Sequence, residues 1–302
     1  MKRYAAQLLI FPLILVLCLA SENRLLAYPD KGTVITVNDV GDTVDAAPGD
    51  GICADDAGKC TLRAAIMESN TTAGSNAIIF DVPVPAVINL TLGELLVTKY
   101  VSILGRGARS LTIQRTTIPN SSNFRVFHLS SSAQLRGLTI QNGNSFGAGG
   151  GILAEAGLGL TDVAIKGNRA ISGGGIAFQG AGGGPTGLQR CLIISNMTTG
   201  QGGGIFVAPG MSALVLSSTL TNNSAADGGA IANFGSTTLV NDTITRNSAS
   251  QSSSSILSSA GHSVGIINTI IGPDIGQTVN SIDGQIGSDG SNIVTNSTGS
   301  TG

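Results

Sequence analysis

A short glycine-rich run that ends in isoleucine recurs through the second half of the chain. It reads GGGI at 149–152, 173–176 and 202–205, GGAI at 228–231 and SSSI at 253–256. The isoleucines are therefore 24, 29, 26 and 25 residues apart, and an asparagine lies eight or nine residues before each one. Fixed landmarks at a variable spacing indicate a solenoid whose coils carry loops of different length.

The composition of the repeat favours strands over helices. Its units are rich in Gly, Ser, Thr and Val and hold short alternating runs such as LTIQN at 138–142. Helical repeats need better helix formers, and the leucine ladder of leucine-rich repeats is absent. Strands that recur once per coil must stack in parallel, about 4.8 Å apart. The sequence therefore predicts an all-β parallel β-helix (solenoid) of roughly eight coils over residues 76–285.

Stacked coils place equivalent residues in columns along the solenoid. We expect an inward column that fills the core, formed by Ile152, Ile176, Ile205, Ile231 and Ile256. We expect a second column whose amides bond along the stack or to turn backbone, formed by Asn144, Asn168, Asn196, Asn223 and Asn247. The glycines before each isoleucine fit a tight corner, where φ is positive or a side chain would clash.

The N-terminus has the pattern of a secretory signal. Lys2 and Arg3 precede the apolar run LLIFPLILVLCLA at 8–20, which is short for a membrane span, with an uncleaved anchor as the alternative. We therefore expect a signal peptide at 1–20 and a protein that is secreted or held at the cell surface. A lead with a disulfide and a helical cap follows at 21–75. The β-helix then runs to 285, and a polar, disordered tail covers 286–302.

Three cysteines follow the signal. Cys53 and Cys60 enclose six residues and should form a small-loop disulfide in an oxidising compartment. Two thiols without a nearby histidine do not make a zinc site. Cys191 is left over, and we expect it to pack as a small apolar residue in a coil.

The stretch CTLRAAIMESN at 60–70 predicts a short amphipathic helix ahead of the solenoid. Thr61 can act as N-cap, with Leu62 and Ile66 on one face and Arg63 elsewhere, and the helix ends at Asn70. The candidate cap residues are Thr61, Leu62, Arg63, Ile66 and Asn70. Because the first coil of a solenoid exposes apolar side chains and unpaired backbone groups, we expect this helix to cover it.

The same residues carry a family resemblance. The stretch DGICADDAGKCTLRAAIMESN at 50–70 closely resembles the Cys-Ser/Thr-Leu-Arg-Glu-Ala segment of bacterial CSLREA-domain proteins. That resemblance implies an exported right-handed parallel β-helix of the pectate-lyase-like fold superfamily, and no particular activity. The family's usual glutamate is Ala64 here, so Thr61 keeps only its own half of the capping box. The GGAI turns also resemble those of polymorphic outer-membrane adhesins.

The sequence indicates no catalytic residues. Between 95 and 273 it offers four acids, Glu155, Asp162, Asp227 and Asp242, and these occupy different phases of the repeat, apart from Asp162 and Asp242 in comparable positions before a strand three coils apart. A glycosidase needs two carboxylates about 5–10 Å apart, and a lyase needs clustered acids with a base. Neither histidine, His128 or His262, has a visible partner. A polysaccharide lyase or glycoside hydrolase acting in a lateral groove is therefore the alternative to a non-enzymatic scaffold.

Composition also bounds the partners. Net charge is −2, which gives no electrostatic case for nucleic acid, and no apolar run after the signal is long enough for membrane insertion. A polysaccharide or a surface protein is the expected partner, with a structural, adhesive or carbohydrate-binding role. We expect no cofactor. A Ca²⁺ site is the alternative to solvated turns for the acids Asp39, Asp42, Asp45, Asp50, Asp55 and Asp56.

Overall fold

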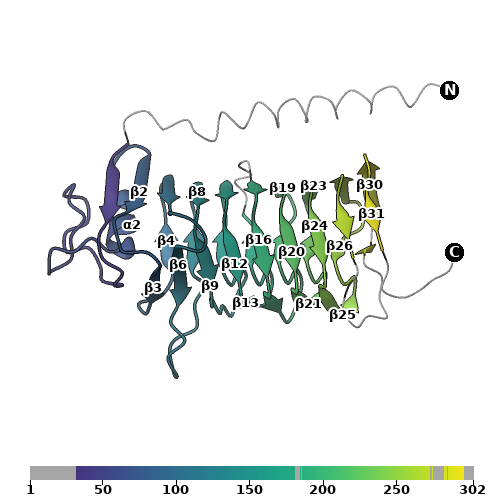
Figure 1. Cartoon of the computed structure of the whole chain (residues 1–302), viewed down its shortest axis with the longest axis horizontal. Coiled ribbons are helices and arrows are strands. Elements are labelled where there is room, and N and C mark those ends of the chain that lie inside the picture. The colour runs from purple at the N-terminus through teal and green to yellow at the C-terminus, as the bar shows by residue number, and fades with distance from the viewer. Residues whose placement is uncertain are drawn as a thin grey trace.

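Parallel pairing between successive coils runs along the whole described chain. The computed structural model describes residues 32–180, 184, 186–272, 274, 282–283 and 285–295, so the expected signal peptide at 1–20 lies outside the described residues. The architecture is the predicted all-β parallel β-helix (Figure 1). One of its sheets, called sheet C below, receives one strand from each coil and has eight strands among the described residues, which gives about eight coils.

Four sheets run along the solenoid, and we call them A to D. Sheet A contains β1 (Val34–Val37), β2 (Asn76–Phe80), β5 (Val101–Leu104), β8 (Ala133–Arg136), β11 (Leu158–Thr161), β15 (Gly187–Gln189), β19 (Ser212–Leu216), β23 (Ser236–Val240), β27 (Ser263–Ile267) and β30 (Gln285–Asp289). Sheet B contains β3 (Ala86–Leu90), β6 (Leu111–Arg115), β9 (Thr139–Gln141), β12 (Ala164–Lys166), β16 (Leu192–Ile194), β20 (Thr219–Thr221), β24 (Thr243–Thr245), β28 (Ile270–Ile271) and β31 (Ile293–Val294). Sheet C contains β4 (Leu95–Val97), β7 (Phe127–Leu129), β10 (Ile152–Ala154), β14 (Ile176–Phe178), β18 (Ile205–Val207), β22 (Ile231–Asn233), β26 (Ile256–Ser258) and β29 (Ile282–Asp283). Sheet D contains β13 (Arg169–Ala170), β17 (Met197–Thr198), β21 (Ser224–Asp227) and β25 (Ser248–Ser252).

The solenoid continues into the segment that the sequence predicted to be a disordered tail. Strand β30 pairs with β27, and β31 pairs with β28, both in parallel. A polar, weakly patterned composition suggested disorder, yet Ile286, Ile293 and Val294 are register partners of Val264, Ile270 and Ile271 in the preceding coil. The prediction of disorder from residue 286 was therefore wrong for residues 286–289 and 293–294.

The five repeat isoleucines lie in one interior column. Ile152, Ile176, Ile205, Ile231 and Ile256 are consecutive register partners in sheet C, and all are fully buried. Phe127 and Leu95 extend the column toward the N-terminus. Burying one such side chain contributes about 1.5–3 kcal/mol, so the column is a major part of the core.

Each glycine-rich run turns a corner just before sheet C. Its first residue has positive φ at Gly149, Gly173, Gly202 and Gly228, and Ser253 takes the same place with φ 40°. A Cβ on Gly173 would collide with the carbonyl oxygen of Ile176 three residues later. Glycine avoids this contact and adopts the left-handed conformation without strain, which explains the GGGI signature.

Left-handed residues also occupy two further corners of the coils. At most of these corners, the backbone N–H of the residue after the corner donates to a side-chain oxygen of the next coil. At the corner after sheet B, Gly167, Ser195, Asn222 and Arg246 have positive φ. The next residue in each coil is an asparagine of the predicted column, Asn168, Asn196, Asn223 or Asn247, and all four are buried. The backbone N–H of Asn168 donates to Asn196 Oδ1, that of Asn196 to Asn223 Oδ1, and that of Asn223 to Asn247 Oδ1, each at 3.0 Å. Asp274 Oδ1 accepts from Asn247 N–H and ends the series.

The side-chain amide nitrogens of these asparagines also donate hydrogen bonds, to backbone carbonyl oxygens and to the next asparagine of the column. Asn196 Nδ2 donates to Asn223 Oδ1 at 3.0 Å and to the carbonyl oxygen of Ile165 at 3.0 Å. Asn168 and Asn223 make the same pair of bonds, so these three amides each donate to the coil before and to the coil after. Such a fully satisfied network is stabilising, whereas a partly satisfied one is costly.

Asn144 does not belong to this column. It bridges to Arg169 rather than Asn168, and its Nδ2 donates to Asn123 at 2.7 Å near the surface. Gly143 takes the position instead, because its N–H donates to Asn168 Oδ1. The segment between Asn144 and Ile152 holds one extra residue, so the equal spacing of eight misled the alignment.

A first prediction concerns the asparagine column. Asn223→Ala removes the acceptor for the N–H and the amide of Asn196 and the donor to the carbonyl oxygen of Ile193. Each unsatisfied buried group costs about 1–3 kcal/mol, so we expect the free energy of unfolding to fall by about 3 kcal/mol or more. Urea denaturation measures it. Asn144→Ala is the matched control and should stay within about 0.5 kcal/mol of the parent; equal effects of the two variants would contradict the column.

Candidate functional site

The motif at 50–70 builds a cap over the first coil. Helix α2 (Leu62–Thr71) begins after Thr61, whose side chain accepts the N–H of Ala64 at 3.1 Å. The predicted disulfide between Cys53 and Cys60 is present just before it. Leu62 and Ile66 are buried against the core, as a covering helix requires.

Arg63 is buried, although the helical pattern placed it away from the apolar face. Its Nε lies 2.7 Å from Asp42 Oδ1, and its two terminal nitrogens donate to the carbonyl oxygens of Gly93 and Glu94 at 2.7 and 3.1 Å. Asp42 Oδ2 accepts the N–H groups of Thr91 and Leu92 in turn. This guanidinium therefore joins the lead segment, the helix and the turn before β4.

Glu68 and Asn70 complete the cap through backbone groups. The buried Glu68 carboxylate accepts the N–H groups of Gly49 and Gly51. Asn70 Oδ1 accepts the N–H of Thr98 at 2.9 Å, and its Nδ2 donates to the carbonyl oxygen of Leu96 at 2.8 Å. The Asn70 amide thus makes the hydrogen bonds that a neighbouring strand would make to β4 at the edge of sheet C. The side chains of Thr61, Arg63, Glu68 and Asn70 each bond to a neighbouring segment, so these residues hold the cap in place.

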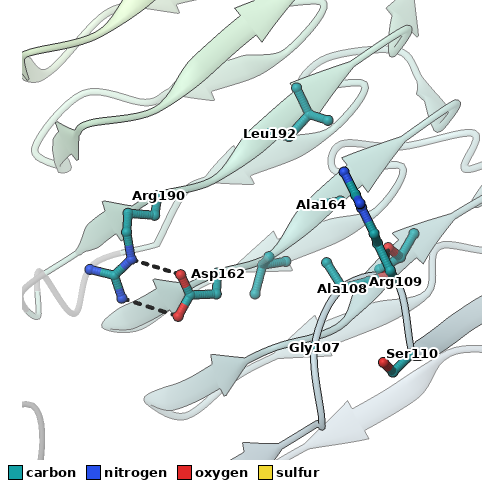
Figure 2. A pocket seen from close by; sticks show the side chains of 10 residues that line it. Gly107, Ala108, Arg109, Ser110, Asp162, Ala164, Arg190 and Leu192 are labelled. Atoms are coloured by element: carbon teal, nitrogen blue, oxygen red, sulfur yellow. Dashed lines mark hydrogen bonds and ion pairs between the residues drawn. The ribbon is translucent and has the colours of Figure 1, made fainter. Parts of the chain in front are cut away.

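A depression lies on the corner between sheets A and B. It has a volume of about 480 Å³ and is lined by the loop 107–110, Thr139, residues 162–164, Arg190 and Leu192. We call it the corner depression. Figure 2 shows the Asp162–Arg190 pair on one side and Arg109 on the other. Asp162 and Arg190, which the sequence left scattered, are thus brought together on adjacent coils.

Electrostatics in the corner depression are dominated by arginine. Arg190 forks onto Asp162 with distances of 2.7 and 3.0 Å, and Arg136 approaches the same carboxylate at 3.9 Å. The hydrogen bonds from Arg190 hold the pKa of Asp162 below its usual value. Asp162 is therefore ionised and occupied, which suits it to positioning Arg190 and not to donating a proton.

A second charged cluster lies on the outer face of sheet C. His128 Nδ1 lies 3.0 Å from Glu94 Oε1, and His128 Nε2 lies 3.2 Å from Glu155 Oε2. Arg125 also contacts Glu94, at 3.2 Å. The contact with Glu155 has ion-pair distance without hydrogen-bond alignment. These contacts are not visible in the sequence, because they depend on register: Leu96 and Leu153 pair with His128 on the neighbouring strands. Glu94 lies two positions before Leu96, and Glu155 lies two positions after Leu153.

Among the described residues, Asp227, Lys166 and His262 share no partner with either cluster. Asp227 accepts from Ser252 Oγ, Lys166 is exposed on β12, and His262 Nδ1 contacts the carbonyl oxygen of Gly235 at 3.0 Å. Cys191 is buried, and burial raises its thiol pKa to about 12, so it packs as an apolar residue.

Asp242 lies inside the solenoid, unlike Asp162. The sequence placed the two in comparable positions, but the left-handed residue aligned with Asp162 is Asn241, and Asp242 comes one residue later. It belongs to a second buried series in which backbone N–H groups donate to side-chain oxygens of the next coil: Cys191 to Ser218, Ser218 to Asp242, Asp242 to Thr269 and Thr269 to Asn292. Burial raises the pKa of Asp242 to about 7 despite the N–H groups it accepts.

The acids of the lead segment are used in local turns. Asp39, Asp45 and Asp50 each accept the N–H two residues ahead, and Asp42 holds Arg63. Asp55 accepts from Thr43, which lowers its pKa. Within the described ranges, no group of three or more His, Cys, Asp and Glu side chains is arranged to hold a metal ion.

No protein-family model matches the chain, and no match was found among curated proteins or solved structures. Among the described residues no helix has the length and apolar character of a bilayer span.

A second prediction tests the cap. Arg63→Met leaves the Asp42 carboxylate buried without its guanidinium, so we expect a loss of about 3–5 kcal/mol in unfolding free energy. Hydrogen exchange should accelerate in β1 to β4 first, because coils contact only their neighbours. The exposed Arg169→Met serves as control. Unchanged protection of β2 to β4 in Arg63→Met would contradict the role of the arginine.

A third prediction follows from the raised pKa of Asp242. Between pH 3.8, its ordinary value, and about 7, the folded carboxyl keeps a proton that the unfolded chain releases. Stability therefore falls as pH rises through this window, by up to about 4 kcal/mol at 1.36 kcal/mol per pH unit. Asp242→Asn should lose this slope and become the more stable protein at pH 8. Urea midpoints at pH 5 and pH 8 measure the difference, with Asp227→Asn as the control that keeps the parental slope; a variant with that same slope would refute the assignment.

Proposed function

We propose that this chain is an exported or cell-surface β-helix protein with a structural, adhesive or carbohydrate-binding role and no catalytic centre. The observation that supports it is that the clustered charged groups are paired with one another. Asp162 is held by Arg190, and Glu94 and Glu155 both contact His128. Paired groups stabilise a surface but are poorly placed to transfer protons.

The architecture is suited to a scaffold. Buried side-chain series at two corners and a capped first coil stiffen a long body whose lateral faces are free for binding. Solenoids generally use such extended lateral surfaces for recognition. The Cys53–Cys60 disulfide and the basic, then apolar, N-terminus support an oxidising, extracytoplasmic location.

The second candidate is a glycoside hydrolase that uses the carboxylates of the His128 cluster. Glu94 and Glu155 lie on coils two apart, so they reach toward one another across about 10 Å of stacked strands. Inverting glycosidases place two carboxylates at a similar separation around the scissile bond. In this chain, however, the His128 ring fills the space between them and contacts both. A sugar could bind there only after displacing the imidazole, which disfavours the hydrolase.

A fourth prediction separates the two candidates. Purified protein, incubated with pectin, polygalacturonate and neutral glycans with and without Ca²⁺, should release no reducing ends and no unsaturated uronates above the level of a heat-treated sample. Turnover that disappears in both Glu94→Gln and Glu155→Gln would overturn the scaffold proposal and establish the cluster as catalytic. Turnover that survives both substitutions would also overturn it and direct attention to another face.

The location is tested separately. Expression of the full chain in a bacterial host with an export pathway should yield protein in the extracytoplasmic or surface fraction, with the first 20 residues removed and the Cys53–Cys60 disulfide formed. N-terminal sequencing and thiol labelling measure both. A chain that stays in the cytoplasm with residue 1 retained would contradict export, whatever the outcome of the turnover assay.

A further inference from the structure

An enlarged corner forms one wall of the corner depression. Two residues separate the sheet A and sheet B strands at 137–138, 162–163 and 190–191, whereas six do so at 105–110. This loop is fixed to the coil that follows. Gly105 and Gly107 donate N–H groups to the carbonyl oxygens of Arg136 and Gly137 at 2.8 Å, and Thr139 Oγ1 donates to the carbonyl oxygen of Ala108 at 2.6 Å. The depression is therefore a built feature of the surface.

Its charge is opposite to that of the chain. Two arginines, Arg109 and Arg190, and one carboxylate, Asp162, line the depression, and Arg136 approaches that carboxylate from outside the lining. The lining therefore carries a charge of +1, and +2 with Arg136, on a protein of net charge −2. Arg109 is exposed and has no ion-pair or hydrogen-bond partner in the described part of the chain. Exposed Lys166 lies two residues beyond Ala164 on the same outward face of β12. The depression is thus short of negative charge.

The floor between the arginines is small and partly apolar. Ala164 and Leu192 are register neighbours on the outer face of sheet B, and Leu192 is 38% exposed. Ser110 and Thr139 add hydroxyl groups at one side. Figure 2 shows Arg109 extending past Ala164, opposite the Asp162–Arg190 pair. A flat ring with a C–H face, hydroxyl groups and one anionic substituent matches this combination.

We propose that the corner depression binds the carboxylate or sulfate group of an acidic polysaccharide. Arg109 pairs with the anion on one side of the depression, Arg190, held in place by Asp162, contacts the sugar from the opposite side, and the ring rests on Ala164 and Leu192 between them. Planar guanidinium groups suit both anions because they can donate two parallel hydrogen bonds. This assignment rests on the proposed carbohydrate-binding role and names its ligand class. Nucleic acid is disfavoured, because it requires an extended basic surface, and none of the residues lining the depression is aromatic.

The test uses the full mature protein and calorimetric titration with three probes of equal length: oligogalacturonate, a sulfated galactan oligosaccharide and the neutral galactan oligosaccharide. We expect at least one acidic probe to bind and the neutral one to bind at least tenfold more weakly. Loss of a charge-assisted hydrogen bond should weaken binding by about tenfold or more in Arg109→Ala. Whichever acidic probe binds more tightly identifies the anion as carboxylate or sulfate, and higher salt should weaken it.

The variants keep the backbone of each corner. Arg190→Asn places at a left-handed position the residue already found there at Asn241, and Arg246→Asn, matched by Asn222, is its control outside the depression. Arg169→Ala is the control for Arg109→Ala. Asp162→Asn removes the competing carboxylate but keeps an amide oxygen that can accept from Arg190, so binding should strengthen by about threefold or more, a gain that misfolding cannot produce.

Each outcome bears on one proposal. Binding that is lost in Arg109→Ala and Arg190→Asn but kept in both controls, and strengthened in Asp162→Asn, supports the site. Acidic binding that all variants retain overturns the depression as the site while leaving a carbohydrate-binding role in place. Equal binding of neutral and acidic probes overturns the ligand class. If none of the three probes binds, the site and the carbohydrate-binding form of the proposed function both fail, and the structural role is then judged by the location experiment.

Discussion

The fold depends on how a coil pairs its backbone at left-handed corners. The residue after the corner directs its N–H toward the interior of the stack, and a side-chain oxygen of the next coil accepts it: Asn196 for Asn168 at one corner, Ser218 for Cys191 at another. A buried donor without an acceptor is costly, which favours a side chain with an oxygen at the corresponding position of the next coil. Asn, Ser, Thr and even the buried Asp242 fill this role. The repeat is therefore defined as much by its buried polar side chains as by its isoleucines.

The isoleucine column could be predicted because the corner before each isoleucine is visible in the sequence. A glycine with forced left-handed geometry stands three residues before each isoleucine, or serine in the last case, so the corner fixes the phase of the strand. The asparagine column lacked such an anchor at its start, since Asn142, the left-handed residue, and Asn144 lie two positions apart around Gly143. An extra residue before Ile152 kept the count at eight and concealed the displacement. Spacing predicts a column only where the intervening loop has constant length.

The charged clusters could not be predicted for a related reason. Glu94 precedes its strand and Glu155 follows its own, so only the register of Leu96, His128 and Leu153 shows that both reach one imidazole. The corner depression depends on the six-residue loop at 105–110, whose length is visible in the sequence only after the strand ends are known. Asp162 and Asp242 looked equivalent, yet one residue of phase moves a carboxylate from the surface to the core. Contacts between coils are thus set by strand register, which can hardly be deduced from composition or local sequence pattern.

The alternation of outward and inward residues at a corner also determines which positions can confer binding specificity. At the corner between sheets A and B, the left-handed residue points outward and its successor points inward, so the outward position can vary without disturbing the core. That column reads Gly137, Asp162, Arg190, Ser217, Asn241 and Asn268 along the solenoid. Adjacent members stand about one strand spacing apart, close enough for Asp162 and Arg190 to pair directly. A substitution at one outward position therefore changes the charge of the lateral surface while the buried series beside it continues to hold the coils. A protein built in this way can acquire a binding surface coil by coil, and the interior need not contribute to it.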